Sequence, residues 1–170
     1  DKSALLNALI KGWTDAAEER SALDLLRGSS IGELNEMLSA VPIERLFSSI
    51  DNRLLGPDHR SELVTLLARE RRAELTPANA AGVIYALQRG RTSREDELAI
   101  RDIVLATRGV ELTTLKNDIN MRTDIYDLEG LVFGAIDDAD IRAEILEHVR
   151  LEANTFVCDE AKIISDIDDT

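Results

Sequence analysis

The sequence contains an internal repeat with a spacing of 78 residues. Residues 8–14 (Ala-Leu-Ile-Lys-Gly-Trp-Thr) align with residues 86–92 (Ala-Leu-Gln-Arg-Gly-Arg-Thr), and the register then continues without a gap. In this register Glu19 aligns with Glu97. A repeat of this kind predicts one supersecondary unit that is used twice, in which each copy buries a face that it cannot bury alone.

The alignment extends to the end of each copy. After a shift of four residues, residues 58–63 align with residues 140–145. We therefore predict a first repeat at residues 1–76 and a second repeat at residues 77–152. The rest of the chain is divided into a linker at residues 153–160 and the start of a further, truncated domain at residues 161–170.

The composition favours an all-α fold. Hydrophobic residues make up 44% of the 170 residues but aromatic residues only 4%, so the core must consist of Leu, Ile, Val and Ala. Apolar residues recur at helical spacing along most of the chain. No stretch approaches the roughly 20 consecutive apolar residues of a membrane span, so we expect no transmembrane segment. The single cysteine, Cys158, fits a reducing compartment, and we expect a cytoplasmic protein.

The net charge of -13 restricts the partners. A nucleic acid backbone would be repelled, so we expect no nucleic acid partner. A bare anionic membrane surface would be repelled in the same way. Any contact with lipid phosphates would therefore need a divalent cation between the two surfaces.

Helix starts are marked by short polar side chains. Thr14 is predicted to be the N-cap of the second helix. Ser30 with Glu33, and Thr92 with Glu95, have the spacing of a capping box, in which two side chains satisfy each other's backbone N–H groups.

Three side chains with reactive chemistry have no obvious partner in the sequence. His59 and His148 have neither a cysteine nor a second histidine at metal-ligand spacing, so we predict surface or packing roles for both. Cys158 has no nearby base in the sequence and is predicted to be a buried thiol.

The predicted order of elements resembles the annexin repeat over residues 2–150. Annexin-like units carry a Lys/Arg-Gly-x-Gly-Thr-Asp/Asn loop, and residues 11–15 (Lys-Gly-Trp-Thr-Asp) and 89–93 (Arg-Gly-Arg-Thr-Ser) stand in that place. The resemblance implies two repeats of four or five helices, packed as a right-handed superhelical bundle. A short β-strand or a disordered tail would follow.

The resemblance also implies calcium binding. In annexins the loop donates backbone carbonyls to Ca²⁺, and a carboxylate about 40 residues later completes a site that bridges to lipid phosphate. Both loops here lack the second glycine and are one residue shorter. The alternative is that the glycines are helix C-caps and that the acidic residues are solvated. The implied ligands are Gly12, Thr14 and Asp51 in the first copy, and Gly90, Thr92 and Asp137 (or the neighbouring Asp138) in the second.

Trp13 is the only tryptophan and lies in the first of these loops. An amphipathic ring at a loop tip is suited to a membrane interface or to a protein partner. The alternative is that it packs against its own helices.

The last residues resemble a second family. Residues 161–165 have the pattern of a buried strand and lead into Asp166-Ile167-Asp168-Asp169-Thr170. An apolar strand followed by Asp-x-Asp-x-Thr is similar to the opening motif of haloacid-dehalogenase (HAD) phosphohydrolases. Residues 164–170 are closest to the phosphatidate-phosphatase branch found in yeast actin-patch proteins and in many bacteria.

This second resemblance assigns roles to three side chains. It implies that Asp166 is the nucleophile, that Asp168 is the acid and base, and that Thr170 positions phosphate. Asp166 and Asp168 would also hold Mg²⁺. These 170 residues lack the remainder of such a domain, so the implied catalysis belongs to a longer parent protein.

Two functions remain open from the sequence. In the first, the repeats would be the non-catalytic binding or regulatory module of a Mg²⁺-dependent phosphatase that acts on phosphatidate-like phosphomonoesters. The module would bind anionic phospholipid through Ca²⁺ at the membrane periphery. Alternatively, the repeats form a purely structural or protein-interaction module, as in annexin-like segments of bacterial proteins associated with contractile injection systems. The absent glycines and the strong negative charge favour the second function.

Overall fold

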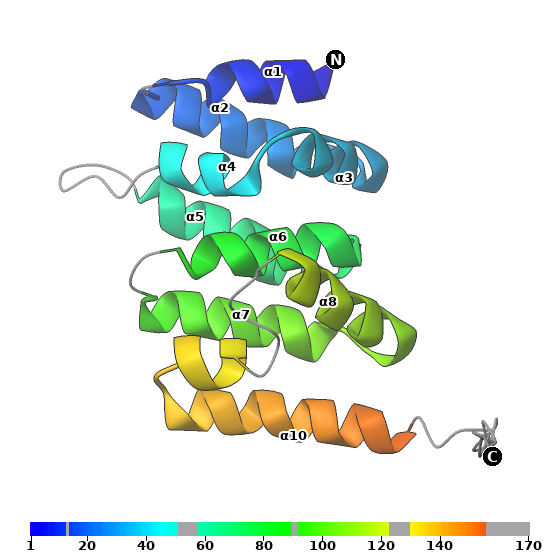
Figure 1. Cartoon of the computed structure of the whole chain (residues 1–170). Helices are drawn as coiled ribbons and strands as arrows, with labels where there is room; N and C mark the ends of the chain where they lie inside the picture. The colour runs from blue at the N-terminus through cyan, green and yellow to red at the C-terminus, as the bar shows by residue number, and fades with distance from the viewer. Residues whose placement is uncertain (13, 51–57, 90–91, 123–129, 156–170) are drawn as a thin grey trace, which may run out of the picture.

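The computed structural model describes residues 1–12, 14–50, 58–89, 92–122 and 130–155, and all regular elements in these residues are helical (Figure 1). The predicted all-α fold is therefore confirmed for this part of the chain. None of the described helices combines the length and the apolar content needed to cross a membrane. The predicted strand at residues 161–165, the linker and Cys158 lie outside the described residues.

The first half of the chain forms a series of short helices. Its last α-helix continues through a π-helical turn, η1, and a single turn of 3₁₀-helix, η2. The bounds are α1 (Lys2–Leu9), α2 (Ala16–Arg27), α3 (Ile31–Ala40), α4 (Ile43–Ser49), α5 (His59–Thr65), η1 (Leu66–Glu70) and η2 (Arg72–Glu74).

The second half follows the same order of elements. Its described elements are α6 (Pro77–Leu87), α7 (Arg94–Ala106), α8 (Gly109–Arg122), the π-helical turn η3 (Leu131–Ala135) and α10 (Ala139–Thr155). The first residues of α2 and α7 are 78 positions apart, and so are those of α3 and α8. The sequence repeat thus coincides with a repeated helix order. In Figure 1 the helices form a stack with α1 and α2 at one end and α10 at the other.

The predicted capping box of α3 is confirmed. Ser30 is the N-cap, its Oγ accepts the backbone N–H of Glu33, and the Glu33 carboxylate accepts the N–H of Ser30. The prediction for α2 is wrong by one residue, because Asp15, not Thr14, is the N-cap and forms a capping box with Glu18. The side chain of Thr14 is buried instead.

The prediction for α7 is wrong by one residue as well. Ser93, not Thr92, is the N-cap, and Asp96, not Glu95, is its partner in the capping box. The spacing of three residues is the same in both pairs. The Glu95 carboxylate instead accepts a hydrogen bond from the Ser61 hydroxyl in the first half.

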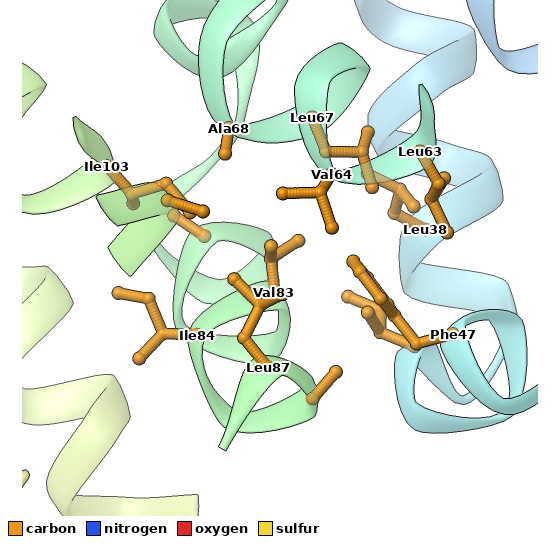
Figure 2. Packing of buried hydrophobic residues seen from close by; sticks show 14 of the residues in the cluster. Leu38, Phe47, Leu63, Val64, Leu67, Ala68, Val83, Ile84, Leu87 and Ile103 are labelled. Atoms are coloured by element: carbon orange, nitrogen blue, oxygen red, sulfur yellow. The ribbon is translucent and has the colours of Figure 1, made fainter. Parts of the chain in front are cut away.

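A continuous apolar core joins the two halves. We call their contact the seam: α5 and η1 of the first half pack against α7 of the second, and α4 and α3 of the first half pack against α6. Figure 2 shows Val64 and Leu67 on one side and Val83 and Ile103 on the other, and none of these side chains is more than 2% exposed. Burial of each aliphatic side chain contributes about 1.5–3 kcal/mol, so the seam is a substantial part of the stability.

Ion pairs flank the apolar part of the seam. Arg60 donates to Asp96 at 2.9 Å, and Arg69 donates to Asp102 at 3.3 Å. In both pairs the arginine lies on the last helical segment of the first half and the carboxylate lies on α7. The seam therefore has a defined polarity, with arginines on one side and acidic residues on the other.

Candidate calcium loops and the buried acidic residues beside them

The first candidate calcium loop is described only in part. Gly12 has a φ of +133°, a conformation that residues with a Cβ rarely adopt, so glycine is required there. The C-cap of α1 is Ile10, so the alternative prediction that Gly12 is a helix C-cap is wrong. Thr14 is buried, whereas Asp51 and Trp13 lie outside the described residues.

The second candidate loop has its acidic residue in a structural position. The backbone N–H of Asp137 donates to Oε1 of Glu97 at 2.7 Å, while the side chain of Asp137 is exposed. Thr92 is half-buried, and Gly90 lies outside the described residues. In neither loop are all three implied ligands among the described residues, so calcium binding there stays a prediction.

The neighbouring Asp138 stabilises the start of α10. Its carboxylate accepts the backbone N–H groups of Ile141 and Asp140 and also a hydrogen bond from Arg94. These bonds, led by that of Ile141, hold the pKa of Asp138 below its usual range. In this structure the Asp138 carboxylate therefore caps α10 and pairs with Arg94, and a calcium-binding role for Asp137 or Asp138 stays a prediction.

Glu19 and His59 form a buried pair in the first half. His59 Nδ1 lies 2.7 Å from Oε2 of Glu19, and the two side chains are 2% and 1% exposed. The pair joins the first turn of α2 to the first residue of α5. The packing role predicted for His59 thus takes the form of a polar contact with an acidic residue.

Glu97 occupies the aligned position in the second half but has different partners. Ile141 aligns with His59, so the second half has no histidine at the position that pairs with the glutamate in the first half. Its carboxylate instead accepts the backbone N–H groups of Asp137 and Asp138 just before α10. Both glutamates therefore join the long second helix of their repeat to the start of the last helix.

Sequence reasoning missed the role of these two glutamates, although a signal was present. Glu19 lies at helical spacing with Ala22, Leu23 and Leu26, all of which are fully buried. An acidic residue within such an apolar stripe, and in both copies, indicates a buried polar contact.

The other ends of these helices are joined by polar side chains as well. Arg71 Nη1 donates to the backbone oxygen of Leu26 at 2.6 Å and to Oγ of Ser29 at 2.9 Å, which satisfies the C-terminus of α2. In the second half, Nε2 of His148 donates to the backbone oxygen of Thr107 at 2.8 Å, beyond the end of α7. His148 therefore has a packing role, as predicted.

The predicted catalytic residues Asp166, Asp168 and Thr170 lie outside the described residues. Within the described parts of the chain, no group of three or more His, Cys, Asp or Glu side chains is arranged to hold a metal ion. The polar side chains discussed above are engaged in joining helices. The roles implied for residues 166–170 in a longer parent therefore stay predictions.

The described residues define an all-α protein. Comparisons with protein-family models, with curated proteins and with solved structures found no match to this chain. Arguments about function therefore depend on the surfaces and contacts of the helices themselves.

Proposed function

We propose that this chain is an annexin-like helical module that binds another protein through the end of the stack formed by α1 and α2. We call this surface the α1–α2 end. The observation that carries the proposal is an exposed apolar surface at positions whose counterparts in the second half are buried. An exposed apolar patch of this kind is typical of an interaction site.

The comparison of α1 with α6 shows the difference. Leu5 is 52% exposed, whereas the aligned Val83 is fully buried in the seam. Ala8 is exposed, whereas the aligned Ala86 is buried. The two helices have the same apolar pattern, but α6 is covered by α4 and α3 of the first half. The outer face of α1 is thus apolar, like the buried face of α6, although it is exposed.

The comparison of α2 with α7 gives the same result. Leu25 is half-buried, while the aligned Ile103 is only 2% exposed. The apolar surface therefore extends from α1 onto α2.

A photo-crosslinking amino acid at position 5 tests this function in cells. We expect crosslinks to protein from position 5, and far fewer from position 45, where Arg45 is exposed on α4. Mass spectrometry of the products identifies what lies against each position. Crosslinks only to lipid, or equal labelling at the two positions, would contradict a protein-binding role.

A second candidate function is favoured by the sequence of residues 164–170. We propose that a longer parent protein is a HAD-type phosphatase, in which the helical module positions or regulates the catalytic domain. Under this proposal Asp166→Asn in the parent reduces phosphatase activity to background, because the nucleophile is lost. Asp169→Asn is the matched control and should keep most of the activity. An unchanged rate for Asp166→Asn would exclude the phosphatase assignment.

A further inference from the structure

We propose that the partner of the α1–α2 end is a second copy of this chain, which binds through α10 and repeats the seam between the two halves. This inference rests on the proposed function, because it names the protein that covers α1 and α2. The seam supplies the template, since both of its sides have counterparts at the two ends of the stack (Figure 1).

The acidic side of the seam is present again on α2. Asp96 and Asp102, which accept hydrogen bonds from arginines across the seam, align with Glu18 and Asp24. Glu18 accepts the N–H of its helix N-cap, as Asp96 does on α7, so the two carboxylates are held in the same way. The side chain of Asp24 is 63% exposed.

The basic side of the seam is present again on α10. Arg60 aligns with Arg142. A π-helical turn adds one residue to a helix, so within η1 the alignment moves back by one position and Arg69 corresponds to Arg150. The side chain of Arg150 is 63% exposed and donates to the carboxylate of Glu147 on the same helix. The two ends of the stack thus have complementary charges at corresponding places.

The apolar centre of the seam has counterparts at both ends as well. Val64 and Val83 face each other across the seam in Figure 2. Val64 aligns with Leu146, which is 39% exposed, and Val83 aligns with Leu5, which is 52% exposed. Two of the large apolar side chains that are exposed on this protein are therefore the ones that would meet in the repeated seam.

The contact joins α10 of one copy to the α1–α2 end of the next. Every assembly of copies therefore keeps an uncovered α1–α2 end and an uncovered α10, to which further copies can bind. Association of this type gives open linear chains and not a closed dimer. One substitution weakens it relative to the seam, because Leu38 is buried near the seam whereas the aligned Lys116 is exposed on α8. We therefore expect reversible association that grows with protein concentration.

Sedimentation equilibrium of the purified 170-residue chain tests the proposal. We expect the average mass to rise with concentration from the 18.8 kDa of a single chain toward multiples of it. Asp24→Arg and Arg150→Asp each place like charges at the contact, so each variant alone should remain at the mass of one chain. A mixture of the two variants should associate again, because each changed end then meets its complement. Circular dichroism of each variant checks that the exposed substitution leaves the helices intact.

A wild-type mass that stays at one chain at every concentration would overturn the inference. So would a dimer that Asp24→Arg dissociates and Arg150→Asp leaves intact, since that result places α1–α2 against α1–α2. Crosslinks from position 5 to a different protein, together with a monomeric wild-type chain, would leave the proposed binding function standing and exclude only the second copy as its partner.

Discussion

Glu19 occupies a position in α2 where the helical period calls for an apolar side chain. Burial of a carboxylate is unfavourable unless polar partners compensate it, and His59 provides such a partner. The contact also fixes the start of α5 against the first turn of α2. The buried carboxylate of Glu97, at the aligned position of α7, accepts backbone N–H groups instead. The two repeats therefore compensate the same buried carboxylate with different polar partners.

Removal of one member of the buried pair should be strongly destabilising. We expect Glu19→Ala to lower the free energy of unfolding by about 3 kcal/mol, because it leaves His59 buried without this partner. The double variant Glu19→Ala/His59→Ala should cost less than the sum of the single changes. Urea denaturation measures all three. Additive effects would show that the two side chains do not stabilise each other, and Glu36→Ala at an exposed site on α3 is the control.

At the scale of single elements, the start of α3 shows how local chemistry fixes a helix end. The same carboxylate oxygen of Glu33 accepts hydrogen bonds from the Lys2 ammonium at 2.8 Å and from the N–H and Oγ of Ser30. Lys2 makes the largest contribution, and together these bonds lower the pKa of Glu33 to about 2. The capping box thereby also joins α3 to the first turn of α1.

This lowered pKa predicts a pH-dependent contribution to stability. The folded-state pKa lies below the reference value of 4.5, so the contribution is present above pH 4.5 and is lost as the pH falls toward about 2. We expect Glu33→Gln to be less stable than the wild type at pH 7, with a difference that narrows as the pH approaches 2. Urea midpoints across this range measure the difference. A gap that is the same at both ends of the range would show that ionised Glu33 does not stabilise α3.

At the scale of the whole molecule, the seam makes the two halves depend on each other. Leu67 is fully buried between helices of both halves, and Arg60 and Arg69 bind carboxylates of α7 beside it. The apolar side chains of α6 are covered by α8 of its own half and by α4 and α3 of the first half, so their burial depends on both halves. The same dependence leaves α1 with an exposed apolar face, which is the basis of the proposed binding function.

The shared core predicts a single cooperative unfolding transition. Tryptophan fluorescence reports on the first half, where Trp13 is the only tryptophan, and far-ultraviolet circular dichroism reports on all helices. We expect the two signals to give the same urea midpoint. Leu67→Ala should shift both together, by about 2–5 kcal/mol in unfolding free energy, because it leaves a cavity in the seam. Separate midpoints would show that each half folds on its own.

The sequence by itself determined the features that depend on neighbouring residues. Helical periodicity and the scarcity of aromatic residues predicted the all-α fold, the repeat predicted the recurring helix order, and the spacing of Ser30 and Glu33 predicted a capping box. The N-caps of α2 and α7 were misplaced by one residue, because in each case two adjacent residues have side chains that can cap a helix. At α2, Thr14 is buried and Asp15 is the N-cap, and at α7 the N-cap is Ser93.

Only the tertiary structure decided which distant residues meet. Glu19 and His59 are 40 positions apart, and nothing in the local pattern distinguishes this pair from Glu97 and the backbone that it contacts. The same holds for α1 and α6, which have similar apolar patterns but differ in whether another helix covers them. Periodicity shows which face of a helix is apolar, whereas the arrangement of the other helices in space decides whether that face is buried.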